Sequence, residues 1–278
     1  MDLASGDRPA VVLLHGVTMS GRVWRRVTPL LAPDLDVHTP TSLGHRGGSP
    51  VDQQPTRVSD LVDDMERYLD AEGLDRPHLV GNSLGGWMAL ELARRGRAAS
   101  VCALSPGGFW DDRGERGRDG TVRTLRRIAM LGRLSRPLGV LPHLLPLSRR
   151  IAMADVAERA DELSPRQAAS AVLDLAECVV LADILTTHER VEPFDELPCP
   201  VTIAWAERDR ILPLRTLGRV ARERIPQARF VILPGVGHVP MIDDPSMVAD
   251  VVLRTVRAAD PAASRGQPVA PALSAVGS

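Results

Sequence analysis

The sequence predicts an α/β fold, with a doubly wound, mainly parallel sheet of about six core strands and a helical cap. Short apolar runs alternate with helical patterns four times before residue 105, which is typical of parallel strands connected by helices. Helical patterns without a convincing strand then fill residues 107–198. Strand patterns resume at residues 201–205 and 230–233. We therefore expect two parts of the chain to build one sheet on either side of an insertion.

The first elements follow in chain order. The wholly apolar run 10–14 is typical of a strand that is covered on both faces. Ser20 is expected to cap the next helix. That helix has an apolar face made of Val23, Trp24, Val27, Leu30 and Leu31. A second strand is predicted at 35–39, a glycine-rich loop at 43–49, and a helix from about residue 58 to a stop at residue 73.

Residues 78–87 read His-Leu-Val-Gly-Asn-Ser-Leu-Gly-Gly-Trp, and the rest of the chain is organised around them. An apolar run ends at a G-x-S-x-G sequence centred on Ser83, and a helical pattern opens at once with Trp87. Glycines two positions before and after Ser83 remove the Cβ atoms that would collide in so sharp a turn. The turn leaves the serine hydroxyl above the sheet, near the backbone N–H groups of the new helix. Another strand is expected at 101–104.

The insertion over residues 107–198 is predicted to be helical and to sit over the carboxyl edge of the sheet. Ser164-Pro165 is a good helix start, with proline at the first helical position. The face expected to be buried contains Ala168, Ala169, Val172, Leu173, Ala176 and Val180. Residues 111–150 contain ten arginines against four acids. A solvated helix face is the first interpretation of this cluster, and a carboxylate-binding arginine is the alternative.

The domain organisation follows from these patterns. Residues 1–106 form the first part of the core, and residues 199–259 form the second part. Helices are expected at about 214–224 and 245–259 in the second part. Residues 260–278 are rich in Pro, Ala, Ser and Gly without periodicity, which predicts a disordered tail.

Composition excludes several classes of function. The formal net charge of -1 over 278 residues implies no nucleic-acid partner and no membrane partner. All 34 basic residues are arginine, and the absence of lysine excludes Schiff-base catalysis, the phosphate loop that needs Gly-Lys, and Ser-x-x-Lys acyl transfer. Cys102, Cys178 and Cys199 lack metal-ligand spacing and are expected to be buried free thiols. No secretory signal or membrane-spanning run is recognised, so a cytoplasmic protein is expected.

The remaining chemistry must come from later loops. A serine hydroxyl is a poor nucleophile without a base at hydrogen-bond distance. Reacting groups gather at the carboxyl ends of parallel strands, so the base should follow a later strand. Loops 206–213 and 234–240 follow the two last strands and contain Asp209 and His238. The chain order is then Ser83, Asp209, His238.

With these motifs the chain resembles the α/β-hydrolase fold superfamily, in its capped, esterase-like branch, over about residues 8–259. The motifs that carry the resemblance are His15-Gly16, the elbow Gly81–Gly85, Arg208-Asp209-Arg210-Ile211-Leu212-Pro213, and Gly237-His238 with Asp243-Asp244-Pro245 behind it. The resemblance implies that Ser83 is the nucleophile, that His238 acts as general base and then acid, and that Asp209 orients the imidazole. It also implies that the backbone N–H groups of Val17 and Leu84 receive the oxyanion.

Other assignments stay open at this stage. The acids that compete with Asp209 are Glu207, Asp243 and Asp244. His15 is expected to brace the oxyanion loop rather than to transfer protons. Asn82 either lines the substrate pocket or only shapes the elbow, and Trp110 either contacts substrate or packs in the core.

The chain departs from the family pattern in two places. Only about nine residues precede residue 10, so the usual N-terminal β-hairpin is expected to be missing. The strand at 35–39 would then lie exposed at one edge, where it could pair with a second chain, so a monomer or a homodimer is expected. Thr41-Ser42-Leu43-Gly44 replaces the Asp and Pro-Gly that many relatives carry in this loop.

The leading hypothesis is a serine hydrolase that cleaves a carboxylic ester or lactone of a small, mainly apolar substrate through an acyl-enzyme. No cofactor and no metal are expected. The first alternative is a C–C bond hydrolase of a vinylogous diketone, although Val239 stands where that family has Trp. A non-hydrolytic natural-product enzyme or a ligand sensor is the other alternative. Haloalkane dehalogenases and epoxide hydrolases need Asp at the elbow and are set aside.

Overall fold

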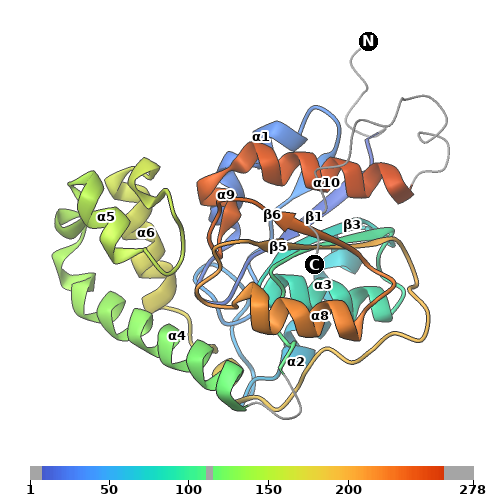
Figure 1. Cartoon of the computed structure of the whole chain (residues 1–278), viewed down its shortest axis with the longest axis horizontal. Coiled ribbons are helices and arrows are strands. Elements are labelled where there is room, and N and C mark those ends of the chain that lie inside the picture. Colours follow the sequence, from blue (N-terminus) through green and yellow to red (C-terminus); the bar gives the residue numbers. More distant parts are fainter. Residues whose placement is uncertain (1–7, 111–114, 260–278) are drawn as a thin grey trace.

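A computed structural model describes residues 8–110 and 115–259 of the chain. These residues form one six-stranded sheet with helices on both faces and a helical insertion at one end (Figure 1). The predictions for the N-terminus before residue 8 and for a disordered tail at 260–278 concern residues outside the described ranges. No helix in the described ranges is long and apolar enough to cross a bilayer.

The sheet has the strand order β2-β1-β3-β4-β5-β6, and all neighbouring strands pair in parallel. The strands are β1 Ala10–Leu14, β2 Asp36–His38, β3 His78–Asn82, β4 Ser100–Leu104, β5 Val201–Ala206 and β6 Arg229–Leu233. The expected fold class is confirmed, and β2 lies at an edge as predicted. Strands β3, β4 and β5 are buried along their whole length, which explains why they appear in the sequence as largely apolar runs rather than alternating ones.

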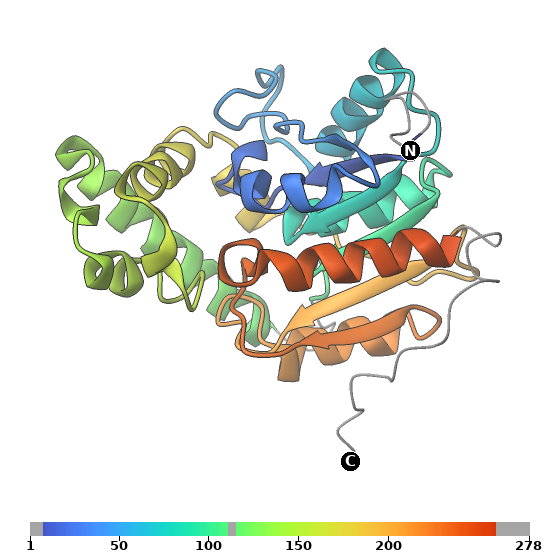
Figure 2. The ribbon, with the colours of Figure 1, turned by 90° about the horizontal axis from the view of Figure 1, so that it is seen from above.

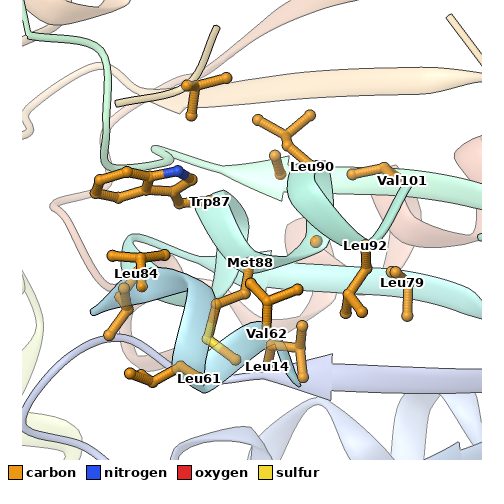
Figure 3. Packing of buried hydrophobic residues seen from close by; sticks show 14 of the residues in the cluster. Leu14, Leu61, Val62, Leu79, Leu84, Trp87, Met88, Leu90, Leu92 and Val101 are labelled. Atoms are coloured by element: carbon orange, nitrogen blue, oxygen red, sulfur yellow. The ribbon is translucent and has the colours of Figure 1, made fainter. Parts of the chain in front are cut away.

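Two helical layers cover the sheet (Figures 1 and 2). One face carries α2 Val58–Ala71, α3 Leu84–Arg94 and α8 Arg219–Arg224, which share a single core cluster. The other face carries α1 Thr28–Leu31, α9 Pro240–Asp243 and α10 Pro245–Ala259. Figure 3 shows the first cluster, in which Leu61 and Val62 of α2 lie near Met88 of α3. Each fully buried side chain of this kind stabilises the fold by about 2 kcal/mol.

The described part of the insertion between β4 and β5 contains helices and turns and no strand. Its elements are α4 Glu115–Ser135, η2 Arg136–Leu138, η3 Leu141–His143, α5 Pro146–Ala152, η4 Ala160–Glu162, α6 Pro165–Ala176 and α7 Leu181–Thr186. Figure 2 shows that the arrowheads of the strands point toward the insertion, so it lies at the carboxyl end of the sheet.

Two helix predictions need correction. Ser20 does not cap a helix, because its hydroxyl donates instead to Asp174, and the segment forms a 3-10 turn, Gly21–Arg26, before the short α1. Helix α6 starts as predicted, with Ser164 and Gln167 forming a capping box. Its buried residues, however, are Ala168, Asp174 and Leu175.

The reason for the second correction is tertiary. Asp174 accepts hydrogen bonds from Ser20 Oγ at 2.7 Å, from Arg46 Nε at 2.6 Å and from Arg22 Nη1 at 3.2 Å. These partners come from loops of the core, so they turn a carboxylate of α6 toward the core. The hydrophobic pattern of one helix cannot indicate polar partners that come from other segments of the chain.

Candidate active site

The elbow places Ser83 between β3 and α3 in a conformation that few side chains adopt. Ser83 has φ 55° and ψ -115° and is 9% exposed. A Cβ atom at Gly81 would lie 2.1 Å from the carbonyl oxygen of Gly85, and one at Gly85 would lie 2.3 Å from that of Leu14. Both positions therefore require glycine, and the sharp turn that lifts Ser83 above the sheet depends on them.

Asp209 and His238 form a buried pair at the ends of β5 and β6. His238 Nδ1 lies 2.7 Å from Asp209 Oδ2. The other carboxylate oxygen accepts hydrogen bonds from the backbone N–H groups of Ile211 at 2.9 Å and Leu212 at 2.7 Å. Because the ionised carboxylate only accepts, Nδ1 carries the proton in this arrangement and Nε2 is left with a free lone pair. The imidazole is thereby held in the tautomer that a general base needs.

Within the part of the chain that the structure describes, none of the three competing acids forms a hydrogen bond or ion pair with His238. Glu207 is exposed and accepts from the N–H of Gly235 at 2.7 Å. Asp243 accepts from three backbone N–H groups, including that of Gly237 at 2.7 Å. Asp244 accepts from the N–H of Met247 at the start of α10.

Asn82 links the elbow to the histidine loop. Its Nδ2 donates to the carbonyl of His238 at 2.9 Å and to that of Leu104 at 3.2 Å. The Asn82 side chain is fully buried and is not among the residues that line the cavity over Ser83. Within the described residues, no hydrogen bond joins Ser83 to His238 directly. Hydrogen bonds of this kind often tighten only when substrate binds.

The loop after β1 lies against the serine. A Cβ atom at Gly16 would lie 3.3 Å from the Cβ of Ser83. The next residue but one, Thr18, has a positive φ of 68°, which turns the loop back on itself. Among described residues, the backbone N–H groups of Val17 and Leu84 have no hydrogen-bond partner. Both residues line the cavity that contains Ser83, so these two donors are available to an oxygen bound there.

His15 holds that loop in place. Its Nδ1 donates to the carbonyl of Gly16 at 2.8 Å, and its Nε2 accepts from the N–H of Ser42 at 3.0 Å. Burial, with a further contribution from nearby His45, lowers the pKa of His15 to about 3. His15 therefore stays neutral at physiological pH and keeps both hydrogen bonds, a geometry that suits bracing rather than proton transfer.

A cavity with an empty volume of about 470 Å³ opens over Ser83. The core contributes Val17, Ser83, Leu84, Trp87, Ile211 and Leu212, and the insertion contributes Gly107, Trp110, Thr121, Val122, Leu125, Ile184 and Leu185. Apart from the tryptophans Trp87 and Trp110, the only lining side chains with a polar atom are those of Ser83 and Thr121. Thr121 Oγ1 donates to the carbonyl of Ile211 at 2.8 Å. The cavity therefore suits an apolar group beside the serine hydroxyl.

The site residues named from the sequence thus divide into two sets. Ser83, Val17, Leu84 and Trp110 line the cavity, whereas Asn82, Asp209 and His238 do not. The wall residues from α4 and α7 were missed, although Thr121 and Leu125 have the i, i+4 spacing of one helix face. No group of three His, Cys, Asp or Glu residues in the described ranges could hold a metal ion, and the three cysteines are free and buried.

The comparisons with known proteins agree with this architecture. The profile of the Alpha/beta hydrolase family matches residues 11–251. An epoxide hydrolase, EphH of Mycobacterium tuberculosis, is 32% identical over 196 residues, covering 69% of this chain and 91% of the relative. A pimeloyl-[acyl-carrier protein] methyl ester esterase of Aromatoleum aromaticum is 28% identical, covering 90% and 99%. The carboxylesterase CesB of Bacillus subtilis has a similar structure, with a TM-score of 0.67 and 18% identity, covering 90% of this chain and 84% of that one.

Proposed function

This chain belongs to the alpha/beta hydrolase family, and on that premise we propose that it hydrolyses a carboxylic ester or lactone with a small, mainly apolar acyl group. The observation that carries the proposal is a serine in a strained elbow, opening into an apolar cavity, with the buried Asp209–His238 pair fastened to the same elbow by Asn82. An acyl chain fits the apolar wall, and the ester carbonyl comes to lie at the serine.

The reaction proceeds in two halves. Ser83 Oγ attacks the carbonyl carbon while His238 Nε2 takes the hydroxyl proton, and the oxyanion is received by the N–H groups of Val17 and Leu84. Asp209 stabilises the imidazolium. His238 then gives its proton to the departing alcohol, which leaves an acyl-enzyme. Water, deprotonated by His238, attacks that ester, and the acid leaves as Ser83 regains its proton.

The residue at the elbow separates ester hydrolysis from epoxide hydrolysis. A carboxylate that opens an epoxide forms an ester, which water can cleave. A serine alkoxide that opens an epoxide forms an ether, which water cannot cleave under these conditions, so Ser83 would be trapped after one turnover. We therefore propose ester chemistry for this chain, although EphH is among its relatives.

The C–C hydrolase alternative receives no support from the cavity. Beside the serine, the cavity wall offers Thr121, whose hydroxyl already donates to Ile211, and Trp110, whose buried Nε1 has no hydrogen-bond partner among the described residues. A charged diketone substrate would need a charged partner, and none of the residues that line this cavity is charged.

We further propose that the insertion, residues 107–198, acts as a cap between core parts 1–106 and 199–259. Five insertion residues from α4 and α7 form part of the cavity wall. The insertion would then contact the acyl group and determine which acyl groups are accepted, whereas the core would bind the carbonyl.

The proposal is tested with p-nitrophenyl butyrate and the pair Ser83→Ala and Ser246→Ala. Ser246 is exposed at the start of α10 and serves as the matched control. We expect Ser83→Ala to lower kcat by at least about a thousandfold and Ser246→Ala to leave it unchanged. A fluorophosphonate should label the wild type at Ser83 with one equivalent. Equal turnover by wild type and Ser83→Ala would overturn the proposal, as would turnover of styrene oxide with Ser83 unmodified.

A further inference from the structure

The insertion carries an unusual surface at its far end. Thirteen large hydrophobic residues of the described chain are exposed, and ten of them fall within residues 130–151. We call these ten the distal apolar patch: Met130, Leu131, Leu134, Leu138, Val140, Leu141, Leu144, Leu145, Leu147 and Ile151. A concentration of exposed large apolar side chains in one segment is typical of a site of interaction with a partner or a membrane.

The patch lies away from the sheet. The segment from the end of α4 to α5 is the part of the insertion most distant from the core in both views (Figures 1 and 2). Along α4, Met130, Leu131 and Leu134 fall within about 100° of arc, whereas the buried Ala129 and Gly132 lie outside that arc. Leu134, Leu145 and Ile151 are each 69% exposed, so the patch is not the outer rim of a core.

The charged side chains within the segment that carries the patch all have one sign. Residues 120–152 contain seven arginines and no acid. Arg127 pairs with Asp155 and Arg136 with Glu177, both outside this range. Arg126, Arg133 and Arg150 are exposed and form no ion pair with any described residue. The net charge of -1, which led us to expect no membrane partner, is an average that conceals this local excess of positive charge.

We propose that the distal apolar patch and its arginines bind the surface of an anionic lipid bilayer. Leucine and isoleucine side chains enter the boundary between headgroups and acyl chains, and the arginines contact lipid phosphates. A second copy of this chain fits less well, because a two-fold contact through the patch would bring the same arginines against one another. The chain would then lie on the membrane without spanning it.

The proposal is tested by co-sedimentation of the full chain with vesicles of phosphatidylcholine alone, or of phosphatidylcholine with about 30% phosphatidylglycerol. We expect the chain to bind the anionic vesicles. The partition coefficient should decrease by at least about tenfold when the salt is raised from a low concentration to about 0.5 M NaCl. The triple variant Leu144→Ser, Leu145→Ser, Leu147→Ser and the double variant Arg133→Gln, Arg150→Gln should each bind at least about tenfold more weakly.

Two controls keep the test specific. Ile232→Ser, on β6, and Arg215→Gln, before α8, remove an exposed apolar side chain and an exposed arginine from the core and should bind like the wild type. Ser83→Ala should also bind like the wild type, so that failure of the ester proposal and failure of this one can be told apart.

Three outcomes would overturn the proposal. The first is no binding of the wild type to anionic vesicles. The second is undiminished binding by both patch variants. The third is a wild-type dimer in sedimentation velocity that the triple variant converts to a monomer, which would assign the patch to a second copy.

Discussion

Asn82, the residue before the elbow serine, donates a hydrogen bond of 2.9 Å to the backbone carbonyl of His238, 156 positions later in the chain. This bond fixes the loop that carries the imidazole to the turn that carries the hydroxyl. The sequence placed Asn82 near the site but left its role open between lining the pocket and shaping the elbow. Its complete burial and its two carbonyl partners favour the second role.

Asn82→Ala should therefore lower kcat for p-nitrophenyl butyrate by about tenfold or more with little change in KM, because the cavity wall is untouched while the base is less well positioned. Unfolding free energy should fall by about 1–3 kcal/mol, since two buried carbonyls lose a donor. Thr255→Val is the matched control, because Thr255 also makes two buried hydrogen bonds away from the site, one to Thr202 of β5 and one to the carbonyl of Val251 within α10. It should lose stability and retain kcat; an equal loss of kcat in both variants would contradict the positioning role.

Asp209→Asn should lower kcat by roughly three to four orders of magnitude. An amide at this position presents either a donor to Nδ1 or a weaker acceptor, so the imidazole loses its tautomer control and the stabilisation of its cation. Glu207→Gln, at an exposed acid two residues away, should be without effect. Kinetics with a soluble ester decide the point, and similar rates for the two variants would show that another acid supports His238.

His15→Asn should make the protein less sensitive to acid. The folded pKa of His15 is about 3, against 6.5 in the unfolded chain, so below pH 6.5 the unfolded state takes up a proton that the folded state does not. The resulting loss of stability grows as pH falls toward 3 and amounts to about 2 kcal/mol between pH 6.5 and pH 5.0. Asparagine keeps a donor and an acceptor but does not titrate.

Urea unfolding at pH 7.5 and pH 5.0 measures this difference. The fall in unfolding free energy between the two pH values should be smaller by about 2 kcal/mol in His15→Asn than in the wild type. In the control variant His188→Asn, which replaces an exposed histidine, the unfolding free energy should fall between the two pH values by as much as in the wild type. An unchanged pH dependence in His15→Asn would show that His15 is not held neutral by burial.

Asp174→Ala should destabilise the chain by about 3 kcal/mol, because it leaves Arg46 and Ser20 without their shared buried acceptor between the insertion and the core. Glu177→Ala, near the end of the same helix, removes only an exposed pair with Arg136 and should cost less than about 1 kcal/mol. Chemical denaturation compares the two, and equal losses would mean that the buried position of Asp174 contributes nothing.

Leu125→Trp should shorten the acyl group that the enzyme accepts. Leu125 lies in the cavity wall, and the larger ring would occupy space beside Ser83. We expect the ratio of kcat/KM for p-nitrophenyl hexanoate to that for the acetate to fall by at least about tenfold. Leu131→Trp, at a 53% exposed position of the same helix, should keep the wild-type ratio. A ratio that stays constant in Leu125→Trp would show that the acyl group lies elsewhere.

The sequence by itself determined the sheet, the elbow and the order of the three polar residues. These features are local or periodic: apolar runs read as covered strands, and Gly81 and Gly85 are required by the turn itself. Helix α6 was also located correctly by its capping box, which joins residues only three apart. Local sterics and short hydrogen bonds act between neighbours in the chain, so they leave a recognisable pattern in the residues.

Only the tertiary structure decided which groups from distant segments meet. In the fold, His238 pairs with Asp209 rather than Asp243, and Asp174 points from the insertion toward the core. Residues of α4 and α7 form part of the cavity wall beside Ser83. The tertiary structure also left the ten large apolar side chains of the distal apolar patch exposed, which the sequence pattern did not indicate. Each of these outcomes depends on what lies opposite a side chain across the fold, and a helix pattern shows which residues share a face but not what that face contacts.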